Sequence, residues 1–443
     1  IFYRQIAWDD IKFCNKEHTM FLPKYYEFCC RVKTIAGHKA LESIAVELDR
    51  LQARNPIIIT DKGVSDAGLI KIVRTALGKK VKIAAIEDTV PPDSDVSVVN
   101  RVAKLYRTKK CDSIIAVGGG SVMDTAKAVN ILVSLGGDDL MSYTGAGKVT
   151  EKLNPLVVIP TTSGTGSEMT LVAVIADHAR KMKMAFTSYF LLPDLAVLDS
   201  RMTKTLPSFL TSSTAMDALT HACEAYTCMG KNPLSDAYAI PAIQLISQNV
   251  VRAVKKPGDV KARLALANGS ALAGVAFSNS MVAIVHNIGH AIGGVCGVPH
   301  GVAMGILLPY GLEYNYHKNA HYTGDLLYPL AGEEEFINTP VNKRPEKAVA
   351  YIRQLNEDLH VATGGRHFRY LKEIVDRNGN QMVPREKFDD IIRTAKGDPA
   401  QFYNPEDVDT SEYHVMLECA YEGVPLDRKK IKKGKRITPF RIP

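Results

Sequence analysis

The chain has 443 residues, of which 46% are hydrophobic and 23% charged, and its formal net charge is +8. This length exceeds what one hydrophobic core usually supports, so the sequence predicts two domains of ordinary globular composition. No run of about 18 consecutive apolar residues occurs, and the first residues, IFYRQIAWDDIKF, lack the apolar segment of a secretory signal peptide. We therefore expect neither an apolar membrane-spanning helix nor a secretory signal peptide.

Cysteine usage and the distribution of charge indicate the compartment of the protein and its possible partners. The eight cysteines include no Cys-x-x-Cys pair, and the adjacent Cys29 and Cys30 are poorly placed to bond each other. Free thiols predict a reducing compartment, here the cytoplasm. Residues 428–436, RKKIKKGKR, carry seven positive charges, so the rest of the chain is nearly neutral. We expect this basic tail to be a solvated end, with an acidic partner as the alternative, and we expect no nucleic-acid partner.

The segment from residue 56 to about 199 alternates strands and helices. Near-continuous apolar runs predict strands buried on both faces of a parallel sheet: PIIIT (56–60), KIAAIED (82–88), SIIAVGGG (113–120) and PLVVIPT (155–161). Between them, DAGLIKIVRTAL (66–77) and VSVVNRVAKLYR (96–107) carry apolar residues at helical spacing. This order predicts an α/β domain with a parallel, Rossmann-like sheet.

The rhythm changes after residue 200. From Pro207 onward long segments rich in Ala, Leu and Ile show no convincing strand. We therefore predict an α/β domain over residues 1–203 and an all-helical domain over residues 204–443, which includes the basic tail.

Two loops rich in small residues follow predicted strands. Gly118, Gly119 and Gly120 come directly after one strand, where glycines let backbone N–H groups approach a phosphate at a helix N-terminus. Ser121 is expected to be the N-cap of the following helix, with Asp124 completing a capping arrangement. PTTSGTGSE (160–168), called the threonine–glycine loop below, follows a second strand. Two such loops at one sheet edge predict a nucleotide site, although a tight strand–helix turn would also explain the glycines.

Asp61 follows the first predicted strand. A carboxylate there could accept hydrogen bonds from the ribose hydroxyls of a dinucleotide. Helix capping or a surface loop position is the alternative for this residue.

The helical half contains an unusual concentration of histidines. His286 and His290 are four residues apart in an apolar stretch, which places them on one helix face, and His300 follows a glycine-rich turn that could bring it back to them. Buried imidazoles must be hydrogen-bonded or coordinate a metal. Upstream, Asp217 and His221 show the same i,i+4 spacing. One carboxylate with several imidazoles suits Zn²⁺ or Fe²⁺, and satisfied core histidines are the alternative.

At this point five ordered motifs resemble the iron-containing (group III) alcohol dehydrogenase family. The motifs are GGGSVMDTAKA, PTTSGTGSE, DALTHACEAY, AGVAFSNSMVAIVHNIGHAIGG and VPHGVAMGILLPYGLEYN. The similarity covers roughly residues 26–421. It implies a dinucleotide-binding α/β domain followed by a helical, metal-binding domain.

The resemblance also implies roles for individual residues. The metal ligands would be Asp217, His221, His286 and His300, and His290 would assist proton movement beside the substrate. Phe277 would line the substrate pocket. The remaining positions would bind the cofactor: Asp61, Gly118, Gly119, Gly120, Ser121, Asp124, Thr161, Thr162, Thr165 and Lys183.

The implied function is a metal-dependent oxidoreductase. It would interconvert a small primary or secondary alcohol and its aldehyde or ketone by hydride transfer with NAD(H), with NADP possible, and with Fe²⁺, Zn²⁺ or another divalent metal. A homodimer or higher homo-oligomer is expected. The alternatives are a glycerol or polyol dehydrogenase, a lyase similar to dehydroquinate synthase, and a nucleotide-binding regulator without catalysis; the apolar surroundings of the histidines argue against the lyase.

Overall fold

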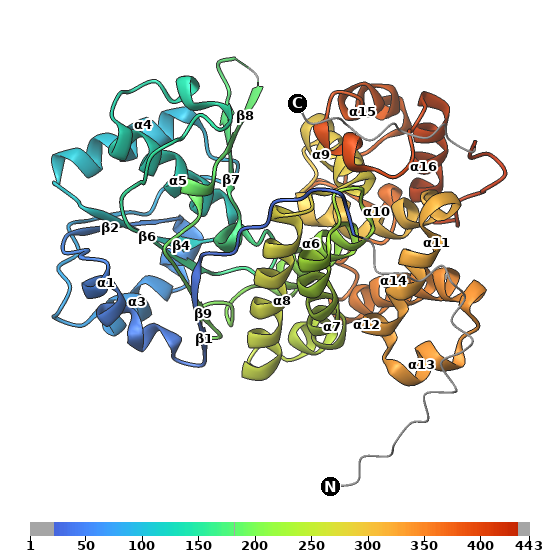
Figure 1. Cartoon of the computed structure of the whole chain (residues 1–443), viewed down its shortest axis with the longest axis horizontal. Coiled ribbons are helices and arrows are strands. Elements are labelled where there is room, and N and C mark those ends of the chain that lie inside the picture. The colour runs from blue at the N-terminus through green and yellow to red at the C-terminus, as the bar shows by residue number, and fades with distance from the viewer. Residues whose placement is uncertain (1–21, 181, 433–443) are drawn as a thin grey trace, which may run out of the picture.

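The computed structural model describes residues 22–180 and 182–432. Figure 1 shows two halves side by side, an α/β half made of the N-terminal part of the chain and a helical half made of the C-terminal part. The predicted fold class is confirmed. The strands of the large sheet end at residue 199 and the next helix begins at residue 208. The division that we predict after residue 203 falls in this connection.

The described part of the α/β half contains a six-stranded parallel sheet. Its strands lie in the order β1 (Lys33–Gly37), β9 (Leu195–Asp199), β6 (Leu156–Pro160), β4 (Ser113–Gly118), β2 (Pro56–Thr60) and β3 (Ala85–Glu87). Every residue of β2, β4, β6 and β9 is buried, which explains why the apolar runs in the sequence are nearly continuous.

Helices cover both faces of this sheet: α1 (Ile44–Arg50), α2 (Lys62–Asp66), α3 (Leu69–Leu77), α4 (Val96–Thr108) and α5 (Gly120–Leu135). Successive residues of β2 point to opposite faces. Ile57 and Ile59 belong to the apolar cluster that contains α4 and α5 residues, whereas Ile58 belongs to the cluster that contains α1 and α3 residues. The sheet is therefore the middle layer of a three-layer α/β half.

A second, smaller sheet was not predicted. In the described residues β5 (Gly145–Ala146) pairs in parallel with β8 (Met182–Thr187), which pairs antiparallel with β7 (Val172–Asp177). In Figure 1 the β7–β8 hairpin rises beside α5, toward the space between the two halves.

The second half is helical, as predicted. Its helices are α6 (Ser208–Thr227), α7 (Pro233–Lys255), α8 (Val260–Ser278), α9 (Ile284–Cys296), α10 (His300–Tyr314), α11 (Tyr316–Asp325), α12 (Leu327–Ala331), α13 (Glu333–Asn338), α14 (Arg344–Ala362), α15 (Phe388–Ala395) and α16 (Thr410–Glu422). Across the described residues after 207, the β-pairing is one isolated bridge between Val375 and Gln381. None of the helices described combines the length and apolar composition needed to cross a bilayer.

Helix α8 joins the two halves. Ala267, Ala271 and Val275 on α8 belong to the same apolar cluster as the residues between the sheet and α5. Gly274 meets Gly166 of the threonine–glycine loop backbone to backbone, since a Cβ on Gly274 would lie 2.6 Å from the Gly166 carbonyl oxygen. Any side chain at either position would push the halves apart.

The basic tail differs from our expectation. Ile431 packs on the helical half, because it is only 6% exposed and belongs to the core cluster of that half. The Lys432 ammonium lies 2.9 Å from the Asp409 carboxylate, and the Arg428 guanidinium lies 4.9 Å from the ring centre of Tyr316. Residues 428–430 and 432 are exposed, in keeping with a solvated end, and the prediction is wrong only for Ile431, which is buried. Residues 433–436 lie outside the described residues.

Candidate functional site

The predicted cofactor residues gather at one edge of the large sheet. Strands β2, β4 and β6 are neighbours and run parallel, so the loops after their last residues meet at the same edge. Gly118, Gly119 and Gly120 form the turn between β4 and α5, called the glycine turn. The N–H of Thr161 donates to the carbonyl of Gly118 at 3.0 Å, which joins the threonine–glycine loop to the glycine turn. The order of the strands, which could not be predicted from the sequence, therefore brings these loops together.

The glycine turn is packed closely by threonines of the other loop. A Cβ on Gly119 would lie 3.3 Å from Thr162 Oγ1, and one on Gly120 would lie 2.9 Å from Thr165 Cγ2. Only glycine at positions 119 and 120 lets the backbone of the turn lie this close to the threonine–glycine loop. The turn leads directly into α5, whose first N–H groups have no partner within the helix. This arrangement suits a pyrophosphate.

Ser121 is not the N-cap that we predicted. The N-cap of α5 is Gly119, and Ser121 lies inside the first turn, where its Oγ accepts from the Asp93 N–H at 3.2 Å. The three consecutive glycines start the helix earlier than the capping preference suggested. Asp93 in turn holds Lys183 of β8, whose ammonium lies 2.9 Å from the Asp93 carboxylate. The structure therefore links Lys183 to the glycine turn through Asp93.

Asp124 does not cap α5 either. Its carboxylate accepts from the Ser167 hydroxyl at 2.8 Å and from the Val174 N–H at 3.0 Å. The predicted capping arrangement is wrong because the side chain points away from the helix start, toward the threonine–glycine loop and the β7–β8 hairpin. Its predicted role toward the cofactor stays a prediction.

Asp61 lies at the same edge of the sheet, after β2. It is the N-cap of α2 and accepts from the Val64 N–H at 2.9 Å. The capping alternative is thus observed, and it leaves the second carboxylate oxygen, Oδ2, for another donor. Lys62, its neighbour, pairs with Asp66 one turn later, with 3.0 Å between Nζ and Oδ1.

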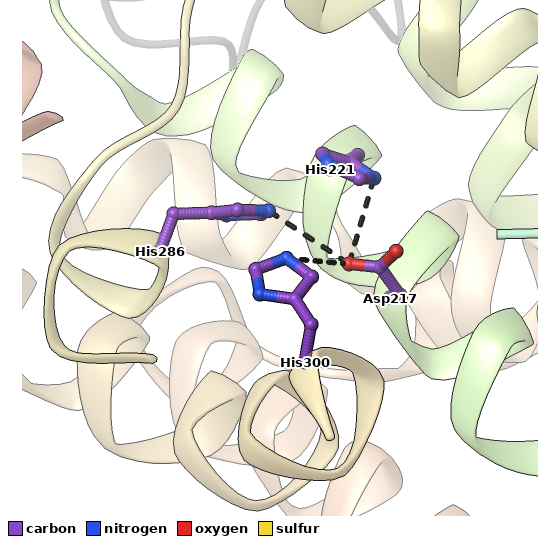
Figure 2. A group of neighbouring side chains, drawn as sticks. All are labelled: Asp217, His221, His286 and His300. Atoms are coloured by element: carbon purple, nitrogen blue, oxygen red, sulfur yellow. Dashed lines mark ion pairs between the residues drawn. The ribbon is translucent and has the colours of Figure 1, made fainter. Parts of the chain in front are cut away.

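The four predicted metal ligands come together in the helical half. One ligand atom from each of Asp217, His221, His286 and His300 lies within 4.8 Å of the others. Figure 2 shows the three imidazoles converging on Asp217 Oδ1 from three directions. The distances to this oxygen are 3.8 Å from His221 Nδ1, 3.9 Å from His286 Nε2 and 3.3 Å from His300 Nε2.

Local packing explains how residues so far apart in sequence meet. Asp217 and His221 lie one turn apart on α6 and face the same way. His300 is the first residue of α10, and Gly301 behind it allows α10 to touch α6: a Cβ there would lie 2.4 Å from the Ser213 carbonyl oxygen. The glycine-rich turn predicted before His300 is confirmed by Gly297, which has a φ of 69°.

The electrostatics of this cluster suit cation binding. Burial lowers the pKa of His221 to about 3 and that of His286 well below its ordinary value, so both rings are neutral. Burial acts to raise the pKa of Asp217, but the surrounding imidazoles, His221 first, hold it well below its usual range. Neutral imidazoles and an ionised carboxylate are the protonation states that bind a metal.

Three buried atoms support this assignment. Within the described residues, Asp217 Oδ1, His221 Nδ1 and His286 Nε2 have no hydrogen-bond partner. Leaving such groups unsatisfied is costly, and a divalent cation between them would satisfy all three. Satisfied core histidines, the alternative considered from the sequence, do not describe this cluster.

His290 and Phe277 border the four ligands. The ring of His290 stacks on that of His300 with 5.3 Å between centroids, and it is more exposed than the rings of His221 and His286. Phe277 lies against the His221 ring, 4.0 Å between centroids and 14° between planes. Their positions fit the predicted proton-moving and pocket-lining roles, which stay predictions.

Glu224 on α6 belongs to the site, although no role was predicted for it from the sequence. Its carboxylate is buried and lies 2.6 Å from His286 Nδ1. Burial raises its pKa to about 7, while N–H groups of Ala283, Val285 and His286 act in the opposite direction and favour the carboxylate. Glu224 lies three residues after His221 on α6, but its partners lie about 60 residues later and could not be inferred from the sequence.

Known proteins are similar to this chain in both sequence and fold. A family model described as "Iron-containing alcohol dehydrogenase" matches residues 32–200, and one described as "Fe-containing alcohol dehydrogenase family, C-terminal" matches residues 211–421. "Alcohol dehydrogenase 4" of Saccharomyces cerevisiae is 31% identical over 87% of this chain and 96% of its own.

Two further relatives add to this. The "NAD-dependent methanol dehydrogenase" of Bacillus methanolicus is 36% identical over 58% of this chain and 67% of its own length. A crystal structure of 1,3-propanediol oxidoreductase superposes with a TM-score of 0.83 at 30% identity, covering 90% of this chain and all of the other.

Proposed function

Because the chain belongs to the iron-containing alcohol dehydrogenase family, we propose that it interconverts a small primary or secondary alcohol and its aldehyde or ketone by hydride transfer with NAD(H). The observation that carries the proposal is the convergence of Asp217, His221, His286 and His300, with three buried atoms that lack a hydrogen-bond partner in the described chain. A non-catalytic nucleotide-binding protein would have no use for such a cluster.

The residues at and around the proposed metal site have separate roles. Asp217, His221, His286 and His300 would hold a divalent metal, which would supply Lewis acidity that makes an alcohol hydroxyl easier to deprotonate and a carbonyl easier to reduce. His290 receives the hydroxyl proton and passes it outward, since its ring borders His300 and is 43% exposed. Phe277, stacked on His221, excludes water from one side of the pocket.

The residues on the cofactor side orient the dinucleotide. The N–H groups at the start of α5 and the bare backbone of Gly119 and Gly120 hold the pyrophosphate, and Thr162 and Thr165 support that backbone. Asp61 receives the adenosine ribose at the end of β2. Ser121, Asp124, Thr161 and Lys183 complete the proposed cofactor site.

We propose iron as the metal, from the family, with Zn²⁺ as the alternative that the same ligand set accepts. The seven cysteines of the described residues are all free, which supports a reducing compartment and hence the cytoplasm. A homodimer stays a prediction that light scattering of the purified protein can check.

The test combines metal analysis with an assay of nicotinamide absorbance across a panel of alcohols and aldehydes. We expect one divalent metal per chain, turnover with small alcohols, loss of turnover on chelation, and recovery when Fe²⁺ or Zn²⁺ is added back. His286→Ala should lose the metal and the activity, whereas His317→Ala, an exposed histidine on α11, should keep both. An active His286→Ala protein without metal would refute the proposal.

A further inference from the structure

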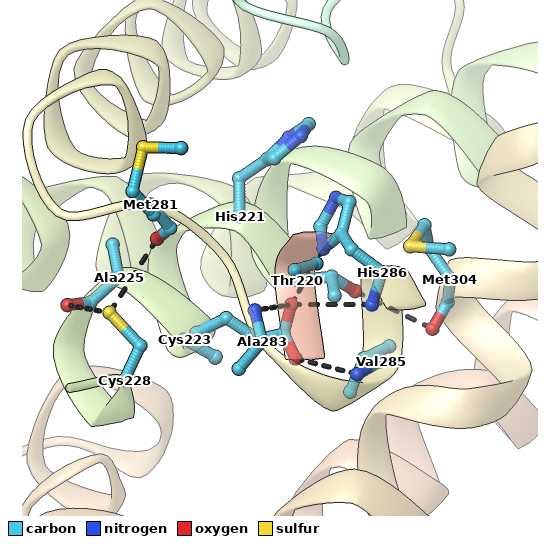
Figure 3. A network of polar contacts seen from close by, with 12 residues as sticks. Thr220, His221, Cys223, Ala225, Cys228, Met281, Ala283, Val285, His286 and Met304 are labelled. Carbon is cyan, nitrogen blue, oxygen red and sulfur yellow. Dashed lines mark hydrogen bonds and ion pairs between the residues drawn. The ribbon is translucent and has the colours of Figure 1, made fainter. Parts of the chain in front are cut away.

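Glu224 connects two helices through its carboxylate. It lies on α6, and its Oε2 accepts from the Ala283 N–H at 3.0 Å and the His286 N–H at 3.4 Å. Its Oε1 accepts from the Val285 N–H at 2.7 Å. Helix α9 begins at Ile284, and its own N-cap residue, Ala283, makes no side-chain hydrogen bond. A carboxylate of α6 therefore takes the place of the missing cap of α9, as the contacts to the labelled Ala283, Val285 and His286 in Figure 3 show.

The same carboxylate holds the His286 ring. Oε2 lies 2.6 Å from His286 Nδ1, and an ionised carboxylate can only accept a hydrogen bond. Three backbone N–H groups donate to the two oxygens of Glu224, which favours its ionised form, so Nδ1 carries the ring proton and the lone pair of the neutral imidazole is on Nε2. Nε2 is the atom that faces Asp217 Oδ1, at 3.9 Å, and it has no hydrogen-bond partner among the residues described.

We propose that Glu224 is a positioning residue that fixes His286 in the Nδ1–H tautomer and aims Nε2 at the metal position. This inference rests on the metal site of the proposed function. A carboxylate behind a ligating imidazole fixes the ring and makes it a stronger donor, and loss of such a partner typically costs about 10- to 100-fold in metal affinity. Because the same oxygens cap α9, the ring and the helix that carries it are set by one group.

The first experiment reads the tautomer in metal-free protein. Long-range ¹H–¹⁵N spectra of ¹⁵N-histidine-labelled protein at pH 8 distinguish a protonated ring nitrogen from one with a lone pair, with the His286 signals assigned by their absence in His286→Ala. We expect Nδ1 protonated and Nε2 bare in the unmodified protein, and a mixture of both tautomers in Glu224→Ala. A predominant Nε2–H tautomer in the unmodified protein would overturn the inference.

The second experiment measures the dissociation constant of Zn²⁺ by competition with a chelator. Glu224→Ala should bind Zn²⁺ about 100-fold more weakly. Glu224→Gln, which keeps an acceptor for Nδ1–H but loses the charge, should bind about tenfold more weakly with its tautomer unchanged. If Glu224→Ala does not fold, Glu224→Gln carries the test alone. Unchanged affinity in the folded variants would overturn the inference.

The matched control is Thr227→Val on the same helix. The Thr227 hydroxyl donates to the Cys223 carbonyl at 2.9 Å and is buried, so its loss weakens α6 without touching a ligand. We expect lower stability and unchanged Zn²⁺ affinity. Equal losses of affinity in Thr227→Val and Glu224→Ala would show that α6 stability alone is responsible. If the unmodified protein binds Zn²⁺ but oxidises no alcohol, the proposed function fails while both measurements still decide the role of Glu224.

Discussion

The Nδ1 atom of His290 lies 2.8 Å from the Asp398 carboxylate, while the ring stacks on that of His300. Asp398 itself is held, because it is the N-cap of a short 3-10 helix and accepts from the Ala400 N–H. The orientation of His290 is therefore fixed by a neighbour on a separate segment of the chain, more than 100 residues away.

This geometry predicts how variants of the pair behave. If His290 moves protons, His290→Ala should keep its metal and lose turnover on the order of 100-fold, with an altered pH profile. Asp398→Asn should keep the metal and lose about tenfold, since the ring loses its charged anchor. Metal content by emission spectrometry and steady-state rates from pH 6 to pH 10 provide the measurement. A His290→Ala protein that loses metal as His286→Ala does would show that the two roles are exchanged.

Cofactor choice should depend on the charge of Asp61. A carboxylate at the ribose position repels the 2′-phosphate of NADP, so the unmodified protein should prefer NAD by about tenfold or more. The neighbouring Lys62 pairs with Asp66 in the structure. Asp61→Gly should raise the relative kcat/KM with NADP, and Asp61→Asn should do the same while still capping α2. An unchanged NAD-to-NADP ratio in both variants would limit Asp61 to the capping role.

The C-terminal segment should contribute to stability and leave the chemistry unchanged. Ile431 is buried against the helical core, so Ile431→Ala should lower the free energy of unfolding by about 2 kcal/mol. Lys430→Ala, at an exposed neighbouring position, should change it by less than about 0.5 kcal/mol. Urea unfolding measures both, and turnover per metal should match the unmodified protein. Equal stability of the two variants would mean that this segment does not pack in solution.

Stability should fall in mild acid partly through His367. Its ring is 3% exposed, with Nδ1 3.2 Å from Ser212 Oγ and Nε2 3.0 Å from Asn356 Oδ1, and burial lowers its pKa to about 4. The unfolded chain takes up this proton near pH 6.5, but the folded chain resists it. Stability is therefore lost as the pH falls from about 6.5 toward 4, by about 2 kcal/mol at pH 5.

His367→Gln removes the titrating ring and isolates this contribution. Between pH 7 and pH 5 the free energy of unfolding of the unmodified protein should fall more than that of the variant, by about 2 kcal/mol. Parallel curves would show that His367 does not titrate differently on folding.

The parts of the fold that were predicted from sequence are those with strong local patterns. β2, β4 and β6 are buried along their whole length, so their apolar runs marked them clearly. β1, with no buried residue in KTIAG, and the β7–β8 hairpin, with mixed exposure, gave no comparable run and were not predicted. Propensity also misled at the start of α5, where the glycines before Ser121 already begin the helix.

The candidate site, like the fold, could be predicted only in part from the sequence. The spacing of Asp217 and His221 and the apolar surroundings of His286 indicated a metal, because helical periodicity fixes which residues share a face. That His300 joins them depends on the contact of Gly301 with Ser213, and the role of Glu224 depends on the start of α9. Both are tertiary contacts between segments far apart in the sequence, and helical or strand periodicity does not predict such contacts.

The threonine–glycine loop has a thermodynamic consequence. Its Thr162 and Thr165 touch the turn proposed for the pyrophosphate, and its Gly164 is pressed against Thr214, one turn before Asp217. The two ligand positions thus share a single stretch of backbone. Linkage then requires reciprocity: whatever factor a bound dinucleotide applies to the affinity for metal, the metal applies to the affinity for dinucleotide. The total free energy of loading both ligands is therefore the same whichever ligand binds first.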